Sequence, residues 1–290
     1  MNAVNAFVAA GYPPLTAMIL AARGMNTPKE VREHLDCNAH MIDPFRMVDM
    51  DKAAGRVGLA MTRGEKIAVF GDYDVDGITA TCLLTDFLRR HGANVVSHIP
   101  GRLEEGYGLN PIAIRQLSAE GVKLIITVDC GITAVEEARL CKELGIDLVI
   151  TDHHECKDRL PEAAAVVDPH RSDCGYPHKN LSGVGVAFKL AAALCGSQED
   201  VLDEYADMVC LGTVADVMIL QGENRVFVSR GLEQLKNTKR PGIAALMKEA
   251  GCTPEAVSAS SIGFMLAPRI NAAGRMGQIE LAVELFLTDD

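Results

Sequence analysis

The chain of 290 residues is 48% hydrophobic and 23% charged, which is typical of a folded globular protein and excludes a disordered or collagen-like one. Its length lies between one large domain and two ordinary ones. The net charge of −11 does not favour a nucleic-acid ligand, because phosphate binding needs a basic surface. The charge is uneven, however, with an acidic excess over residues 124–175 and a basic excess over residues 221–275. A metal-dependent phosphoesterase or an ordinary solvated surface would show such a distribution.

The chain shows no sign of a membrane segment or of a secreted, disulfide-bonded protein. No stretch approaches the roughly 18 consecutive apolar residues of a membrane span, and prolines stand where a signal peptide would have its apolar helix. Nine cysteines, an odd number without a CxxC pair, indicate a reduced environment. Cys82, Cys195 and Cys210 lie in apolar runs and are predicted to be small core residues. We therefore expect a cytoplasmic protein with no membrane partner.

The first half of the chain predicts a helical lead and then an alternation of strands and helices. Residues 1–45 contain an apolar segment at 15–22 and a helix start at Thr27-Pro28, with Glu30 three residues after the capping threonine. Residues 44–50 are a candidate linker before a helix at 50–63. The predicted strands are 66–70, 94–99, 123–128, 147–151 and 163–167, and the helices between them are 78–90, 110–120 and 134–144. This order predicts an α/β fold with a doubly wound, mainly parallel five-stranded sheet.

The second half is predicted to be helical. Helices are expected at 185–195, 201–211, 224–236, 243–250 and 279–287. The predicted organisation is a helical lead over residues 1–48, an α/β core over 49–220 and a helical extension over 221–290.

Acidic residues and histidines follow four of the five predicted strands. They are Asp72, Asp74 and Asp76 after the first strand, Asp129 after the third, Asp152, His153 and His154 after the fourth, and Asp168 and His170 after the fifth. The carboxyl ends of parallel strands meet at one edge of a sheet, so these side chains are expected to lie together. Carboxylates this close repel each other unless a cation lies between them. Mixed Asp and His ligands suit Mn²⁺ or Mg²⁺, and two such ions form a clamp for in-line displacement at phosphorus.

Each of these signals also has a simpler interpretation. A lone Asp after a strand is more often a helix N-cap than a ligand. The run from Asp72 to Asp76 resembles the start of a calcium loop, but the twelfth position, Leu83, is apolar. Spacing alone places Asp216 in an apolar helix or at an N-cap. Residues 182–185 open a helix whose free N–H groups suit a phosphate, and they equally suit a plain glycine turn.

Several motifs resemble those of a known superfamily. GDYDVDGITAT, TVDCGI, TDHHE and GTVADVMIL, in this order, look like the motifs of the DHH phosphoesterase superfamily. PGRLEEGYGLN, SGVGVAFKL and APRINAAGRM make the chain more similar to its RecJ-type branch of single-stranded-DNA exonucleases. The resemblance runs over nearly the whole chain.

The resemblance implies a metal-dependent phosphodiesterase. Such an enzyme degrades single-stranded DNA from 5′ to 3′ into 5′-mononucleotides, in DNA repair and recombination. It implies two ions, Mn²⁺ or Mg²⁺. The metal ligands would be Asp74, Asp76, Asp129, His153 and Asp216, with Asp72 beside them. Asp129 would lie between the ions, His154 would contact the scissile phosphate or protonate the leaving group, and Asp152 would orient the histidines. The residues implied in phosphate or DNA binding are Ser182, Gly183, Arg269, Asn271 and Arg275.

The match also has departures. Many members have a histidine where this chain has Phe70, and nothing in residues 221–290 resembles the family's second domain with its glycine-rich substrate loop. We therefore expect this chain to hold the metal half of the site. Aromatic residues make up only 4% of the chain, so platforms for base stacking are scarce. Surface salt bridges are the simpler interpretation of Arg269 and Arg275.

Two alternative functions stay open. One is a DHH-family oligonucleotidase or phosphatase for short nucleotides, which a preference for dinucleotides would indicate. The other is an inactive DHH scaffold in a replication or repair complex, which a lack of metal-dependent cleavage would indicate. Helicases and single-strand-binding proteins are expected partners by analogy.

Overall fold

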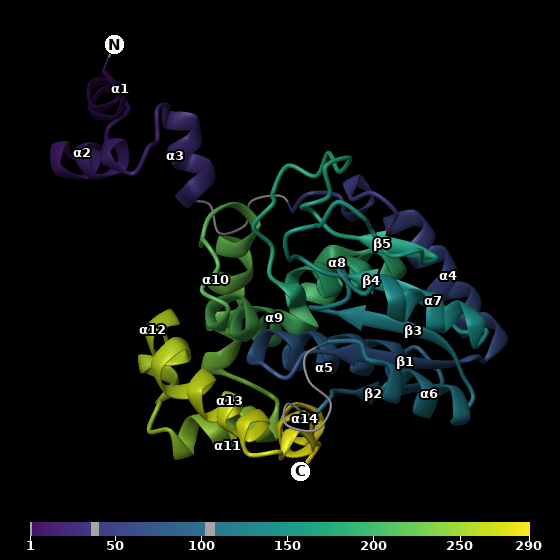
Figure 1. Cartoon of the computed structure of the whole chain (residues 1–290). Helices are drawn as coiled ribbons and strands as arrows, with labels where there is room; N and C mark the ends of the chain where they lie inside the picture. Colours follow the sequence, from purple (N-terminus) through teal and green to yellow (C-terminus); the bar gives the residue numbers. More distant parts are fainter. Residues whose placement is uncertain (1, 36–40, 102–107) are drawn as a thin grey trace.

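The structure, a computed structural model, describes residues 2–35, 41–101 and 108–290 (Figure 1). Cys37 and residues 102–107 of the PGRLEEGYGLN motif lie outside the described residues. Of the helices in the described part of the chain, none combines the length and the apolar character needed to cross a bilayer.

Five strands form one sheet in which every neighbouring pair is parallel, in the order β2-β1-β3-β4-β5. They are β1 (Lys66–Gly71), β2 (Val95–His98), β3 (Val122–Val128), β4 (Asp147–Thr151) and β5 (Ala165–Val167). The predicted fold class is confirmed. The chain passes from β1 outward to β2 and then returns to β3 on the other side of β1. This reversal is the switch point at which doubly wound sheets bind their ligands.

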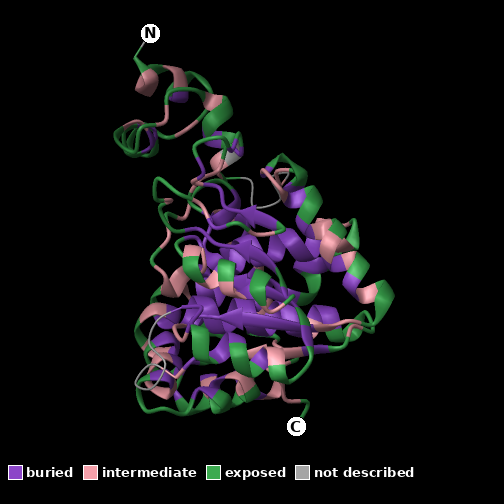
Figure 2. Ribbon diagram, turned by 45° about the vertical axis from the view of Figure 1, so that its right-hand side comes forward, coloured by how far each residue is buried: buried purple, intermediate pink, exposed green. Residues whose placement is uncertain are grey.

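Helices cover both faces of the sheet, and the strand residues alternate between them. Helices α4 (Met50–Arg63), α5 (Val75–Arg90) and α8 (Gly183–Cys195) lie on one face, and α6 (Pro111–Ala119) and α7 (Val135–Glu143) lie on the other (Figure 1). Ile67 and Val69 of β1 belong to the apolar cluster of the first face, whereas Ala68 and Phe70 belong to that of the second. Strands β1, β3, β4 and β5 are therefore largely buried on both sides, as Figure 2 shows, whereas the edge strand β2 is half-buried.

The remaining helices extend the first face and form the N-terminal lead. They are α1 (Ala3–Ala9), α2 (Pro14–Ala22), α3 (Pro28–Leu35), α9 (Gln198–Ala215), α10 (Gly222–Lys236), α11 (Pro241–Glu249), α12 (Ala259–Ser261), α13 (Ala267–Arg275) and α14 (Ile279–Leu287), with a π-helical turn at Ile262–Leu266. Helix α9 packs against α5, α8 and α10. Helices α1 to α3 enclose a small cluster of their own around Phe7 and Leu20, and α3 contacts α10.

Helices α5, α8 and α9 begin two or three residues earlier than predicted. Asp74, Ser182 and Ser197 are the N-caps of α5, α8 and α9, and each side chain accepts a hydrogen bond from a backbone N–H in the first turn. The prediction followed the apolar spacing, which begins only after these polar or glycine-containing first turns.

Three further expectations need correction. The candidate linker at 44–50 contains a short 3₁₀ turn, and its Met47 and Met50 are core residues. Cys82 and Cys210 are buried as predicted, but Cys195 is exposed because it lies in the last turn of α8. Residues 259–275, for which no helix was predicted, are helical.

A buried lysine joins three distant parts of the fold. The Lys189 ammonium of α8 is fully buried and donates to the Glu223 carboxylate of α10, to the carbonyl of Ile42 at 2.8 Å and to Gln198 Oε1 at 2.6 Å. Glu223 also accepts the Tyr176 hydroxyl at 2.5 Å and the N–H of Ile42 at 2.8 Å. The ion pair therefore holds Ile42, in the segment between α3 and α4, against the core.

Candidate metal centre

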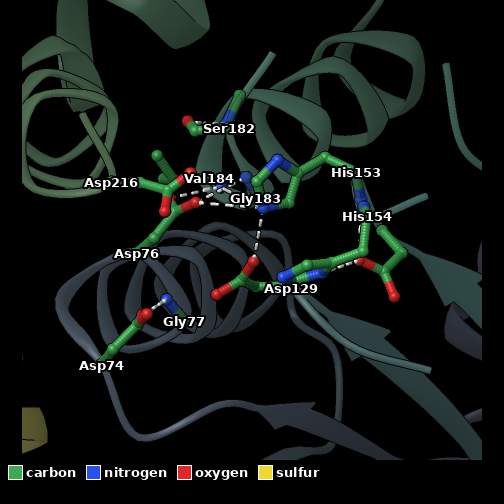
Figure 3. A network of polar contacts seen from close by, with 12 residues as sticks. Asp74, Asp76, Gly77, Asp129, His153, His154, Ser182, Gly183, Val184 and Asp216 are labelled. Carbon is green, nitrogen blue, oxygen red and sulfur yellow. Dashed lines mark hydrogen bonds and ion pairs between the residues drawn. The ribbon is translucent and has the colours of Figure 1, made fainter. Parts of the chain in front are cut away.

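Three strand ends and one helix end deliver acidic and imidazole groups to one place (Figure 3). The loop after β1, the residues after β3 and β4, and the C-cap of α9 contribute them. In three groups the ligand atoms lie within 4.8 Å of one another: Asp76, His153 and Asp216; Asp72, Asp74 and Asp129; and Asp129, His153 and His154. All six residues predicted as metal ligands are therefore brought together. Asp216 lies at the end of a helix rather than at an N-cap.

His153 and Asp129 form the centre of this arrangement. His153 Nε2 lies 3.0 Å from Asp129 Oδ1, 3.7 Å from Asp216 Oδ2 and 3.8 Å from Asp76 Oδ2. Asp129 has a φ of 58°, in the left-handed region that a non-glycine residue adopts at a cost of about 1–2 kcal/mol. Such strain is found at functional sites, because it aims a side chain that a relaxed backbone would direct elsewhere.

Asp76 is held by the N-terminus of helix α8. Its carboxylate accepts the N–H of Gly183 at 2.6 Å and the N–H of Val184 at 2.9 Å. A Cβ on Gly212 of α9 would lie 2.6 Å from Asp76 Oδ1, so only glycine fits there. Gly212 lies in the GTVADVMIL motif, but sequence reasoning assigned it no role because its partner is far away in the chain.

The expectation that Ser182 and Gly183 offer free N–H groups to a phosphate therefore needs correction. The N–H of Gly183 is already donated to Asp76. Ser182 is fully buried, where its hydroxyl accepts the N–H of Gly185 at 3.3 Å and lies 3.0 Å from the Thr213 hydroxyl. The positive end of the α8 helix dipole therefore stabilises the Asp76 carboxylate, in the way that it could stabilise a phosphate.

The electrostatics of the cluster favour a bound cation. Burial, with the carboxylates nearby, raises the pKa of Asp72 to about 7, that of Asp76 to about 7, and that of Asp129 well above its ordinary value. Burial also raises the pKa of Asp216. Among the described residues, the buried Oδ1 of Asp72 accepts no hydrogen bond, and Asp129 Oδ1 faces the His153 imidazole at 3.0 Å. Several carboxylate oxygens with one imidazole are a donor set that fits Mn²⁺ or Mg²⁺.

Asp74 combines two of the interpretations that the sequence left open. Its Oδ1 accepts the N–H of Gly77 at 3.0 Å, which makes it the N-cap of α5. It also belongs to the group with Asp72 and Asp129. The capping bond uses one lone pair of one oxygen, so the carboxylate keeps other lone pairs for a cation.

His154 is oriented by Asp152 and stays partly open to solvent. His154 Nδ1 lies 2.7 Å from Asp152 Oδ1, and the side chain of His154 is 48% exposed. The hydrogen bond that the His154 imidazole donates to the Asp152 carboxylate raises the pKa of His154 to about 9. Asp152 in turn is held by the N–H groups of Ile132 and His153, at 2.9 Å and 2.7 Å. This geometry gives a protonated imidazole with a fixed orientation at the edge of the cluster.

Asp168, after β5, joins the same edge of the sheet without belonging to the three groups. It is fully buried, its Oδ1 accepts the N–H of His170 at 2.6 Å, and burial raises its pKa to about 7. This bond closes a turn over residues 168–170.

The arginine-containing segment lies against the loop that carries the first aspartates. A Cβ on Gly274 would lie 2.8 Å from the carbonyl of Tyr73, so helix α13 approaches this loop closely. Arg269 and Arg275 are exposed, and Arg269 Nη1 donates to the carbonyl of Met265 at 2.7 Å. Phosphate contact by Arg269, Asn271 and Arg275 stays a prediction.

Residues 66–213, which include the strands and most of the cluster, match the family described as the DHH family, N-terminal domain. The chain belongs to the DHH family. It is 45% identical over 278 residues to the single-stranded-DNA-specific exonuclease RecJ of Bacillus subtilis, covering 96% of this chain and 35% of that protein. It is 37% identical over 295 residues to RecJ of Escherichia coli, covering 97% and 51%. This DHH-family chain thus spans between a third and a half of the length of these relatives.

Solved structures of the same family are also similar. A crystal structure of exonuclease RecJ bound to manganese has a TM-score of 0.77 at 38% identity, covering 86% of this chain and 63% of that one. RecJ from Thermus thermophilus in complex with Mn²⁺ has a TM-score of 0.81 at 33% identity, covering 98% and 40%.

Proposed function

We propose that this DHH-family chain carries the metal centre of a RecJ-like exonuclease. It would hydrolyse phosphodiester bonds of single-stranded DNA from the 5′ end and release 5′-mononucleotides, in repair and recombination. The observation that carries the proposal is the convergence of the six predicted ligands around Asp129. The names of the similar proteins, and the manganese bound in one of the similar structures, support it.

The cluster offers two adjacent places for a divalent cation, and we propose Mn²⁺ or Mg²⁺ in both. Asp76, His153 and Asp216 would hold one ion, Asp72 and Asp74 would hold the other, and Asp129 would lie between them. Bound ions would neutralise charge on the phosphate and make water a stronger nucleophile.

Residues of the chain would carry out the remaining chemistry. His154 would face the scissile phosphate as a cation or give a proton to the leaving oxygen, because Asp152 keeps its ring protonated. Asp129, Asp152 and His154 are thus the proposed catalytic residues. Guanidinium groups of Arg269 and Arg275, with the Asn271 amide, would hold phosphates of the strand. Ser182 and Gly183 would act indirectly, by holding Asp76.

The wider setting follows from the RecJ-like proposal. The protein would act in the cytoplasm, beside helicases and single-strand-binding proteins. Within the chain, residues 49–220 would form the catalytic core, with residues 1–48 as a lead and residues 221–290 as an extension that carries the arginine segment.

The test is cleavage of a 5′-labelled single-stranded oligonucleotide with Mn²⁺, beside a matching duplex, a dinucleotide and an Asp129→Ala variant. Metal-dependent release of labelled mononucleotide, lost in the variant and absent on the duplex, is the expected result. Circular dichroism of the variant shows whether it keeps the fold.

The other outcomes favour the alternatives. Hydrolysis of dinucleotides without any cleavage of long strands would favour an oligonucleotidase. Calorimetric binding of Mn²⁺ without hydrolysis of either substrate would favour an inactive scaffold.

A further inference from the structure

Helix α9 ends in a turn that normally requires glycine, but this chain has valine there. Val217 follows the C-cap residue Asp216 and has a φ of 57°. The N–H of Val217 donates to the carbonyl of Val214 at 3.1 Å, and the N–H of Met218 donates to that of Thr213 at 3.2 Å. This pair of bonds defines a Schellman turn, in which the left-handed residue is usually glycine.

The same chain uses glycine at this position after seven other helices. The residues that directly follow the C-caps of α1, α2, α5, α6, α7, α11 and α13 are glycines with a positive φ: Gly11, Gly24, Gly92, Gly121, Gly145, Gly251 and Gly277. A β-branched side chain is a steric outlier in this region of the backbone, so Val217 destabilises the turn relative to glycine.

Packing does not explain the valine. Its side chain is 86% exposed, and Ile219, two residues later, is 56% exposed. These two exposed apolar side chains follow Asp216 by one and three residues in the chain, and Asp216 belongs to the group with Asp76 and His153. Strain without a packing gain, one residue from the cluster, indicates that the side chain itself is used.

We propose that Val217, together with Ile219, contacts the base of a nucleotide held at the carboxylate cluster. The proposal rests on the proposed function, since it assumes that a strand binds there. The faces of the bases are the apolar part of a single strand, and contact with them is independent of sequence. An aliphatic contact also suits a chain without tryptophan and with only 4% aromatic residues.

The test compares 5′-phosphorylated trinucleotides whose terminal sugar carries a base or is abasic. Wild-type protein, Val217→Gly and Val217→Asn are compared with Ile112→Asn, which removes an exposed apolar side chain from α6. Glycine and asparagine tolerate the left-handed backbone, so both variants keep the turn. The readouts are binding by fluorescence anisotropy, KM and kcat with Mn²⁺, and the Kd for Mn²⁺ alone.

We expect wild-type protein and Ile112→Asn to bind the base-containing trinucleotide about fivefold more tightly than the abasic one, and both Val217 variants to lose this difference. Their Kd for Mn²⁺ and their kcat should stay unchanged, and the melting temperature of Val217→Gly should rise.

Two results would overturn the inference. The variants could keep the wild-type preference for the base, or they could weaken Mn²⁺ and both trinucleotides equally, which would show that Val217 acts only through Asp216. If wild-type protein binds neither trinucleotide, the proposed function fails together with the inference. If it binds without cleaving, the anisotropy data still decide the role of Val217.

Discussion

Gly183 lies so close to Asp129 that a Cβ on the glycine would be 2.4 Å from the Cβ and 2.5 Å from the Oδ1 of the aspartate. These residues come from the first turn of α8 and the end of β3. The missing side chain of one residue therefore makes room for the central carboxylate of the cluster.

Replacement of Gly183 by alanine should displace Asp129 and weaken metal binding. We expect Gly183→Ala to raise the Kd for Mn²⁺ at least about tenfold, in line with the loss of a group that orients a ligand, and to lower activity at least as much. The measurement is isothermal titration calorimetry with Mn²⁺. Gly185→Ala, two residues later in α8, is the control, because the added Cβ would meet only ordinary van der Waals contacts at 3.5 Å. Equal Mn²⁺ affinity in the two variants would contradict this account.

Removal of the Lys189 charge should destabilise the fold strongly, since it leaves the Glu223 carboxylate buried without its cation. We expect Lys189→Met to lower the free energy of unfolding by about 3–5 kcal/mol. The double variant Lys189→Met, Glu223→Gln should recover most of that loss, because the amide can still accept the hydrogen bond from Tyr176. Urea unfolding followed by circular dichroism measures both. A double variant that is no more stable than the single one would refute the explanation.

The pH dependence of activity should report the Asp152–His154 pair. In Asp152→Asn the carboxylate that raises the pKa of His154 to about 9 is removed, so this pKa should fall toward the ordinary value of 6.5. If His154 acts in its protonated form, the alkaline limb of the pH–rate profile should move to lower pH by one unit or more. Profiles of kcat at saturating Mn²⁺ check this, and an unmoved alkaline limb would exclude His154 as the titrating acid.

The stability of the metal-free protein should decrease as the pH rises. Burial raises the pKa of Asp72, Asp76 and Asp168 to about 7, from the ordinary value of 3.8. Between these values the folded state binds more protons than the unfolded state. The stability that these carboxyls contribute is therefore fully present below about pH 3.8 and is lost progressively as the pH rises to about 7. The lowered pKa values of His34 and His178 act in the opposite direction, but these are two groups against three carboxyls.

Melting temperatures in EDTA from pH 5 to pH 8 measure this effect. Mn²⁺ should bind more tightly at higher pH, because it competes with the protons of the cluster carboxyls. Bound Mn²⁺ should therefore remove the decrease of the melting temperature with pH. A melting temperature in EDTA that rises over this range would show that the carboxylates are ionised without metal.

Sequence reasoning succeeded where a local pattern carries the information. The continuous apolar runs around Val69 and Ile126 predicted the parallel sheet, because only strands buried on both faces have that pattern. Carboxylates placed directly after strands predicted the cluster, because parallel strands end at one edge. The DHH motifs added Asp216, which reaches the cluster from the end of α9, where spacing predicted only a helix.

The remaining features depend on contacts between distant residues. Asp76 lies 107 positions before Gly183, so the sequence could not show that the donors at the start of α8 are engaged by this carboxylate. The burial of Lys189 and the solvent exposure of Cys195 were equally invisible, because both residues lie in one apolar-looking helix. The strain at Val217 required backbone angles.

The hydrogen bonds from Gly183 and Val184 to Asp76 make two backbone amides into internal reporters. Each amide is protected from isotope exchange with deuterated water only while the carboxylate stays in place. Whatever moves Asp76, including a substitution on α5 or α9, therefore changes an exchange rate on α8. Mass spectrometry of the peptide that spans the start of this helix can follow the geometry of the cluster without any substrate.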